Sequence, residues 1–352
     1  MNSVITGTGI GQATHAVPNE RLARIMDTSD EWIRTRSGIE QRYFAAPGES
    51  SSSLGTKAAR NALANAGKQP ADIDAVIFAT MTPDMVLPSN GPLLQRDLGL
   101  GHVPTFDIRQ QCSGFLYALE LGDALIKSGK YRTLLLVGAE VHTPFMPWHL
   151  GWDTTIGLSD REVTEKEREI NTSIRDRTVL FGDGAGAVVL EASEEEGRGL
   201  LLTRLFTDGT AWKCLSMSGA GFKNRPFVTA EQIENFETVP HMEGREVFRQ
   251  AVKLMPEAVR KVVDEAGVAL SDVKLVLIHQ ANLRIIEGVQ KQLGLSAEQV
   301  PHNIERYGNT TAATLPILLH ECIEDGRVKK GDLIVFTALG SGVHWGAALY
   351  RH

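Results

Sequence analysis

Apolar and polar positions along the chain follow a pattern that occurs twice. Residues 60–77 and residues 260–277 both show apolar positions at helical spacing, then a glycine, a short polar loop and an apolar run. This pattern predicts an amphipathic helix that ends at the glycine and is followed by a buried strand. The copies are 200 positions apart, and the predicted strands cover residues 75–80 and 275–279. Chance similarity of two such units is the alternative.

A second pair of segments follows the first pair in the same order. Residues 107–129 and residues 303–326 each run through an apolar helical stretch to a glycine, which lies 17 positions after Cys112 in one copy and after Asn309 in the other. The strands predicted after these helices cover residues 133–138 and 333–338.

Two repeats in the same order predict an α/β chain built from two similar halves, residues 1–192 and 193–352. Each half should contain a mainly parallel sheet with buried helices. By this repeat Cys112 and Asn309 occupy equivalent positions, just before or at the start of a helix, and His279 ends a strand of the second half. Since sites in α/β sheets form beyond the carboxyl ends of strands, we expect these three residues to share one cleft.

Composition narrows the class of protein. Hydrophobic residues make up 42% of the chain and charged residues 22%, as in ordinary soluble proteins. No apolar run approaches the ~20 residues that span a bilayer, and the first residues do not resemble a secretion signal, so we expect a cytoplasmic protein. The net charge of -7 and the lack of a basic run argue against broad nucleic-acid binding. Three widely spaced cysteines fit neither a disulfide framework nor a metal site.

Five motifs resemble those of one enzyme family. They are DTSDEWIRTRSGI (27–39), QQCSGFLYAL (110–119), LFGDGAGAVVL (180–190), HQANLRI (279–285) and RYGNTTAATLP (306–316). In this order along the whole chain they are similar to the signatures of the beta-ketoacyl-acyl carrier protein synthase III family. The resemblance implies a duplicated thiolase-like fold, a homodimer, and substrates that are coenzyme A thioesters and acyl carrier protein. It implies no metal or redox cofactor.

The resemblance implies a role for each of three residues. Cys112 would be the nucleophile that carries the acyl group, and the free N–H groups at the start of a helix would favour its thiolate. His279 and Asn309 would donate hydrogen bonds to the enolate that forms when a malonyl thioester loses carbon dioxide. The alternatives are a small buried cysteine, a strand-end histidine bonded to backbone, and an asparagine that caps a helix.

A glycine-rich loop of the family is similar to Gly340, Ser341 and Gly342. The backbone N–H of Ser341 would be the second oxyanion donor beside that of Cys112. Family members often carry three glycines here, so Ser341 is a departure that could change the acyl pocket. The segment FGDGAG (181–186) lacks the lysine of a phosphate loop, and we interpret it as a structural turn beside that pocket.

The resemblance also assigns substrate contacts. Trp32 and Arg36 would stack on the two faces of the adenine of coenzyme A. Asn282 would bond to the pantetheine arm and Phe248 would pack against it, whereas Arg245 replaces the usual Asn and would alter the nucleotide contacts. Further assigned positions are Arg175 for coenzyme A, Leu87, Leu180, Phe181 and Met242 for the acyl pocket, and Arg249, Arg284 and Lys291 for a basic patch that receives the carrier protein.

Residues 143–177 form a segment about two dozen residues longer than in short family members. We predict a helix that begins near Ser159, and a role in shaping the acyl tunnel or the dimer interface. A solvated surface excursion is the alternative. Leu87 is smaller than the aromatic residue of short-chain enzymes, which is compatible with acyl chains longer than acetyl.

The sequence therefore predicts an acyltransferase that loads an acyl group onto Cys112 and condenses it with a malonyl thioester, in the initiation of fatty acid synthesis. One alternative is a secondary-metabolite or long-chain acyl-CoA condensing enzyme of the same fold. Another is a non-catalytic acyl-binding scaffold, against which the intact set of Cys112, His279 and Asn309 argues. A thiol protease is excluded because Asn309 and the duplication have no use in it.

Overall fold

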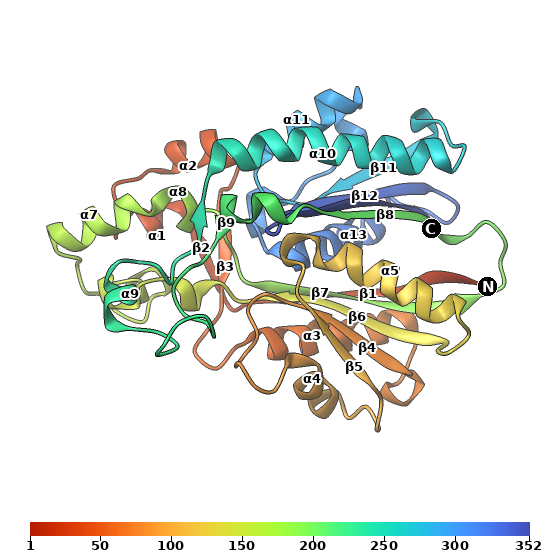
Figure 1. Ribbon diagram of the computed structural model, residues 1–352, viewed down its shortest axis with the longest axis horizontal. Helices are drawn as coiled ribbons and strands as arrows, with labels where there is room; N and C mark the ends of the chain where they lie inside the picture. Colours follow the sequence, from red (N-terminus) through yellow and green to blue (C-terminus); the bar gives the residue numbers. More distant parts are fainter.

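Sheets and helices alternate in five layers, as a computed structural model of all 352 residues shows (Figure 1). Two sheets lie face to face with a helical layer between them, and a further helical layer covers the outer face of each sheet. The outer helices are α10 (Gly244–Glu265) and α11 (Leu283–Leu293) on one side and α3 (Ser51–Ala66) and α4 (Asn90–Leu98) on the other; α5 (Gly114–Lys127) and α13 (Thr314–Glu324) form the middle layer.

Both sheets are mixed, so the prediction of mainly parallel sheets is wrong. The first has the order β1-β7-β6-β4-β5 and the second the order β11-β12-β13-β8. Only β4 with β5 and β6, and β11 with β12, pair in parallel. In the second sheet only residues 341–343 join β12 to β13, which is too short for a parallel crossover. The bounds are β1 Asn2–Gln12, β4 Ala75–Ala79, β5 Thr105–Ile108, β6 Thr133–Glu140, β7 Gly184–Ser193, β8 Gly199–Thr207, β11 Val273–Ile278, β12 Leu333–Gly340 and β13 His344–Arg351.

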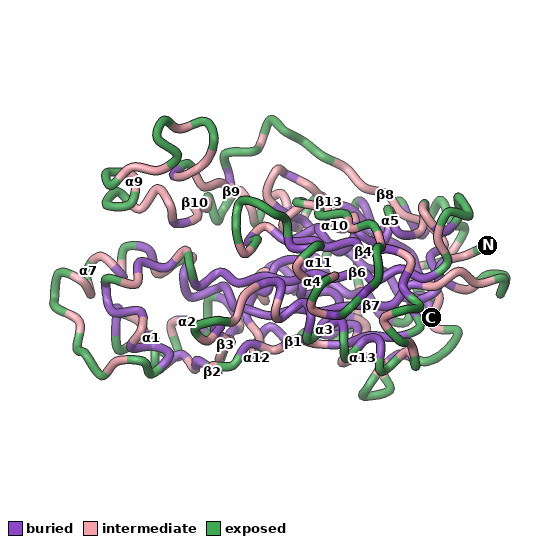
Figure 2. Tube along the Cα trace, turned by 90° about the horizontal axis from the view of Figure 1, so that it is seen from below, coloured by how far each residue is buried: buried purple, intermediate pink, exposed green.

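The middle layer forms the central core. Helices α5 and α13 are apolar on nearly every side, as expected for helices packed between two sheets. Leu116 of α5 and Leu318 of α13 are fully buried, together with Leu136 of the first sheet and Phe336 of the second, in one hydrophobic cluster. The trace in Figure 2 is buried where the strands overlap and exposed mainly along its outer loops. No helix is both long enough and apolar enough to span a membrane.

A short turn precedes each middle helix and corrects the equivalence predicted from the sequence. The 3-10 turns Gln111–Ser113 and Thr311–Ala313 stand before α5 and α13, and their first residues share an unusual positive φ of 47° and 45°. At this offset of 200, Cys112 corresponds to Ala312 and not to Asn309. Helix α13 has 11 residues and α5 has 14, so the glycine after α13 comes three positions earlier in its copy. The equal distances from Cys112 and Asn309 to these glycines therefore do not make the two residues equivalent.

Residues between β6 and β7 extend away from the sheets at one end of the molecule, beside the segment that contains α9 (Figure 1). Helix α7 begins at Glu165, where Thr164 caps it, and not near Ser159 as predicted. The side chain of Asn171 accepts from Trp152 Nε1 at 2.9 Å and donates to the carbonyl of Ile25 at 3.1 Å, which fixes this segment on the N-terminal helices. The remaining elements are β2 His15–Pro18, α1 Asn19–Ala23, α2 Asp30–Ser37, β3 Gln41–Phe44, α6 Asp153–Ile156, α7 Glu165–Ser173, α8 Arg175–Thr178, β9 Leu215–Ser216, α9 Ala230–Glu234, β10 His241–Met242 and α12 Ile304–Tyr307.

Candidate active site

Cys112 lies in the turn before α5, and only 6% of its surface is exposed. A Cβ added at Gly340 would come within 2.9 Å of the backbone nitrogen of Cys112 and 3.0 Å of that of Ser113. Glycine at this position therefore lets the end of β12 pack directly against the turn. Burial, and after it the charge of Glu140, raise the pKa of the Cys112 thiol to about 12. The backbone N–H at this turn lowers the pKa of the thiol, as expected, but desolvation outweighs that effect.

His279 follows the last residue of β11, and its backbone N–H donates to Thr337 of the neighbouring strand. The ring is 1% exposed, and Nδ1 lies 2.7 Å from the Thr314 hydroxyl. Its Nε2 is buried without any hydrogen-bond partner. Burial lowers the pKa of His279 to about 3, so the ring is neutral at physiological pH.

Asn309 is fixed on both of its backbone groups. Its N–H donates to Leu180 at 2.8 Å, and its carbonyl accepts from Gly182 at 3.1 Å. The side-chain Oδ1 accepts from the N–H of Thr311 at 2.9 Å, which orients the amide and leaves its NH2 group as a donor. The alternative, an asparagine that caps a helix, is not observed, because Thr310 is the residue before the turn Thr311–Ala313.

One largely apolar cavity of about 600 Å³ contains all three of these side chains. Besides Cys112, His279 and Asn309, it brings together the predicted residues Trp32, Arg36, Leu180, Phe181, Met242, Phe248, Asn282 and Arg284, and also Arg245. It is not lined by Arg175, Leu87, Gly340, Ser341, Gly342, Arg249 or Lys291.

Trp32 lies at the entrance between two arginines. The guanidinium carbons of Arg36 and Arg175 are 4.4 and 4.3 Å from its ring centroid. Arg175 thus contacts the site through Trp32, although it does not line the cavity. Both guanidinium groups lie within cation–π distance of the indole, so positive charge gathers at this ring.

Other predicted residues lie outside the cavity for visible reasons. Leu87 stands 82% exposed on a loop, so its place in an acyl pocket stays a prediction. Arg249 forms an ion pair with Glu246 at 2.7 Å, which offsets its charge in the predicted basic patch. The Ser341 hydroxyl donates to the carbonyl of Leu215. Arg284, which does line the cavity, donates to the carbonyl of Thr35.

Within the long segment 143–177, Asp176 is the one residue that lines the cavity. The predicted effect of this segment on the acyl tunnel or on a dimer interface stays a prediction. The segment 181–186 is not a turn as predicted, because its last three residues begin β7 and Phe181 forms a bridge to Asn309. Its buried carboxylate, Asp183, accepts from the N–H groups of Ala45 and His142, which agrees with a structural role.

Sequence reasoning missed two buried groups next to the site. Glu140 ends β6 and accepts from the N–H and hydroxyl of Thr82, at 3.1 and 2.5 Å. Its position at the carboxyl end of a strand was a signal that could have found it. Thr314, which contacts His279, gave no signal, because its role depends on the approach of α13 to β11.

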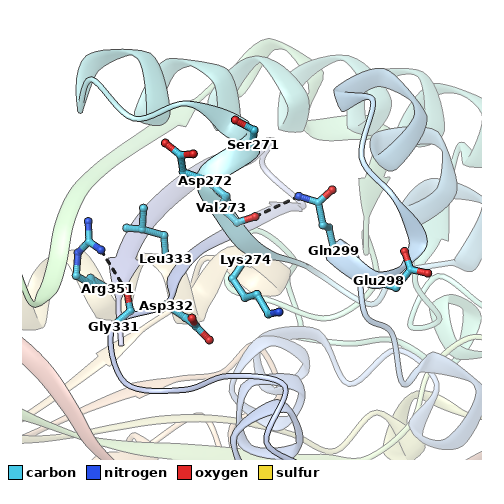
Figure 3. A pocket seen from close by; sticks show the side chains of 10 residues that line it. All are labelled: Ser271, Asp272, Val273, Lys274, Glu298, Gln299, Gly331, Asp332, Leu333 and Arg351. Carbon is cyan, nitrogen blue, oxygen red and sulfur yellow. Dashed lines mark hydrogen bonds between the residues drawn. The ribbon is translucent and has the colours of Figure 1, made fainter.

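A second cavity, of about 550 Å³, lies at the opposite ends of the second sheet (Figure 3). Val273 and Leu333, which line it, are the first residues of β11 and β12, whereas His279 follows the last residue of β11. The lining is mostly polar and charged, and Gln299 and Arg351 bond to backbone carbonyls there. Since the reactive residues lie at the carboxyl ends, the first cavity is the candidate active site.

Known proteins match the chain along its length. The sequence profile of 3-oxoacyl-(acyl-carrier-protein) synthase III matches residues 106–160 and 165–209, and the profile of its C-terminal region matches residues 263–352. The beta-ketoacyl-(acyl-carrier-protein) synthase III of Rhizorhabdus wittichii is 41% identical over 99% of both chains, and that of Aquifex aeolicus is 40% identical over 100% of both.

A solved structure shares the fold. The crystal structure of 3-oxoacyl-(acyl-carrier-protein) synthase III from Aquifex aeolicus superposes with a TM-score of 0.84 at 39% identity, covering 99% of this chain and 100% of that one. This confirms the predicted fold class and the resemblance read from the motifs. The chain therefore belongs to the 3-oxoacyl-(acyl-carrier-protein) synthase III family of condensing acyltransferases.

Proposed function

We propose that this protein transfers an acyl group from coenzyme A to Cys112 and then condenses it with malonyl-acyl carrier protein, to start fatty acid synthesis. The observation that carries the proposal is the meeting of three side chains from separate segments in one cavity: a buried thiol, and two side chains, His279 and Asn309, with nitrogens free to bind a substrate. An apolar cavity with a few converging polar groups is typical of a small-molecule site.

In the first step the sulfur of Cys112 attacks the thioester carbonyl, and the bond from carbonyl carbon to coenzyme A sulfur breaks. The thiol proton of Cys112 ends on the departing sulfur, so coenzyme A leaves as its thiol. Backbone N–H groups of Cys112 and Ser341 would stabilise the intermediate oxyanion. Because the thiol has a raised pKa, its proton must leave as the thioester reacts.

In the second step the malonyl carboxylate leaves as carbon dioxide, and its bonding electrons form an enolate of the thioester. Nitrogen-bound hydrogens of His279 and Asn309 would donate to the enolate oxygen in a site shielded from water. The enolate carbon attacks the acyl group on Cys112 and forms the new carbon–carbon bond. The Cys112 thiolate leaves and takes up a proton from solvent, and the product is a beta-ketoacyl thioester.

The remaining parts of the proposal concern the residues that bind the two substrates and the assembly of the protein. Arg36, Arg175 and Trp32 at the entrance offer stacking and positive charge to the nucleotide of coenzyme A. Arg284 and Lys291 would receive the acidic carrier protein, with less help from the paired Arg249. We also propose a cytoplasmic homodimer that needs no cofactor, in which the exposed Leu87 reaches the partner subunit's acyl pocket.

Intact-protein mass spectrometry tests the proposal. The protein is incubated with acyl-coenzyme A species from acetyl to dodecanoyl, and wild type is compared with Cys112→Ala. We expect an acyl adduct on wild type alone, and the chain that loads best identifies the primer. Malonyl-acyl carrier protein should then discharge the adduct with release of carbon dioxide. An adduct that persists in Cys112→Ala, or no adduct with any donor, would overturn the proposal.

A further inference from the structure

The Thr314 hydroxyl lies between two hydrogen-bond partners. Its Oγ1 lies 2.7 Å from Nδ1 of His279 and 3.0 Å from the carbonyl oxygen of Thr311. Thr314 and His279 are both nearly fully buried. A hydroxyl has one hydrogen, so it can donate to only one of these atoms at a time. The atom to which the hydroxyl donates determines which nitrogen of a neutral His279 carries the proton.

Two observations favour donation to Nδ1. The carbonyl of Thr311 already accepts from the backbone N–H of Thr314, so it keeps a partner when the hydroxyl turns away. The separation of 2.7 Å is also typical of a hydroxyl donor rather than a ring N–H donor.

We propose that Thr314 is a positioning residue that donates to Nδ1 and so holds His279 as the tautomer with its proton on Nε2. This inference rests on the proposed function, in which His279 acts on the malonyl thioester. The unpartnered Nε2 then presents an N–H and no lone pair. His279 is a hydrogen-bond donor to the substrate and not the base that removes the Cys112 proton.

The same turn orients both donors of the site. The N–H of Thr311 holds Oδ1 of Asn309, and three residues later Thr314 holds Nδ1 of His279. Each contact occupies the acceptor atom of its side chain, Oδ1 of Asn309 or Nδ1 of His279. The N–H donor of each side chain stays available to the cavity. A pair of donors fixed in this way matches the needs of decarboxylation, which creates negative charge on one oxygen.

Selective nitrogen-15 labelling of histidine in the wild-type protein tests the tautomer directly. The spectrum should show a bare Nδ1 and a protonated Nε2 for His279, assigned by loss of the signals in His279→Ala. A protonated Nδ1 would overturn the proposal. This measurement uses the native chain and does not depend on how a Thr314 variant folds.

Kinetics of the two half-reactions test the consequence. Thr314→Val keeps the side-chain shape but removes the donor, whereas Thr314→Ser keeps the donor. We expect Thr314→Val to slow malonyl decarboxylation by about 10–100-fold, as losses of orienting partners do at other histidines. Acylation of Cys112 should stay within about twofold, and Thr314→Ser should restore decarboxylation.

Equal losses in both half-reactions, or a serine variant as slow as the valine variant, would overturn the proposal, because a merely structural role predicts them. A wild-type protein that never acylates Cys112 would instead refute the proposed function. The two failures are therefore distinguishable.

Discussion

The two halves of the molecule share a backbone arrangement but differ in side chains. Where one half has a reactive residue, the other has a small one at the equivalent position. At the common offset of 200, Cys112 corresponds to Ala312 and His279 to Ala79. The duplicated turns keep the same backbone, including a positive φ at their first residues. What differs is therefore the side chains, and the chemistry is distributed over both halves.

The small residues of one copy make room for the groups of the other. Gly340, the counterpart of Glu140, leaves space for the Cys112 turn. Gly114, the counterpart of Thr314, would carry a Cβ only 3.0 Å from that of Ala79 and 3.2 Å from that of Ala312. The comparison indicates that only the paired halves form the proposed site, since neither holds both the proposed nucleophile and the two proposed donors.

Removing the proposed nucleophile should have the largest effect. Cys112→Ala makes its turn resemble that of the second half, and we expect condensation to fall by about a thousandfold or more, because no covalent intermediate can form. Steady-state product formation from acyl-coenzyme A and malonyl-acyl carrier protein measures this. Cys214→Ala, which removes another buried thiol outside the cavity, is the matched control and should stay active.

Changes to the donors should have a smaller effect, confined to one step. His279→Ala and Asn309→Ala should each slow malonyl decarboxylation by about 10²–10³-fold, the usual cost of losing one oxyanion donor. Acylation of Cys112, followed by mass spectrometry, should remain within a few-fold of wild type. A comparable loss in acylation would contradict the division of labour between the halves.

Several strands of the two halves, and the residues that share the cavity, could be predicted from the sequence. The strands predicted at 75–80 and 133–138 begin where β4 and β6 begin, because apolar runs bounded by polar turns report buried strands reliably. The motifs around Cys112, His279 and Asn309 predicted residues that share a cavity. Local pattern and family resemblance were sufficient for these features.

Other features depend on contacts between distant segments. The antiparallel strands β7, β8 and β13 escaped prediction because strand direction is set by how connections return, which apolar periodicity does not reveal. The net rise in the pKa of Cys112 escaped prediction because it depends on burial and on Glu140, 28 positions later. The bond between Thr314 and His279 likewise forms only when α13 packs beside β11.

The first half has a buried carboxyl group, that of Glu140, where the second half has Gly340. The effect of this difference can be tested. Burial raises its pKa to about 7 from an ordinary value of 4.5. As pH rises from 4.5 to 7, the unfolded chain releases this proton while the folded chain keeps it, so the free energy of unfolding should fall by up to about 3 kcal/mol. Glu140→Gln should lack this loss, and urea unfolding of both proteins from pH 4.5 to 8 measures the difference. A difference that does not vary with pH would contradict the prediction.

The same variant should change the nucleophile. Because the charge of Glu140 helps to raise the pKa of Cys112, Glu140→Gln should shift alkylation of Cys112 by iodoacetamide to lower pH. Asp183→Asn, which neutralises the buried carboxylate directly before β7, is the matched control. It should shift the profile less, since Asp183 does not contribute to the pKa of Cys112.

The smallest expected effect comes from the glycine that faces the nucleophile. Gly340→Ala puts a methyl group 2.9 Å from the Cys112 nitrogen and 3.0 Å from the Gln110 carbonyl, both backbone atoms that cannot rotate away. We expect a loss of about 1–3 kcal/mol in the free energy of unfolding, as for other overpacked sites, and slower acylation because the oxyanion donors shift. Gly101→Ala, where an added Cβ meets no atom within 4 Å, should change neither. A Gly340→Ala protein as stable and as fast as wild type would contradict this prediction. The lack of a side chain at Gly340 would then not position the turn that holds Cys112, and the pairing of small with reactive residues across the halves would not affect the site.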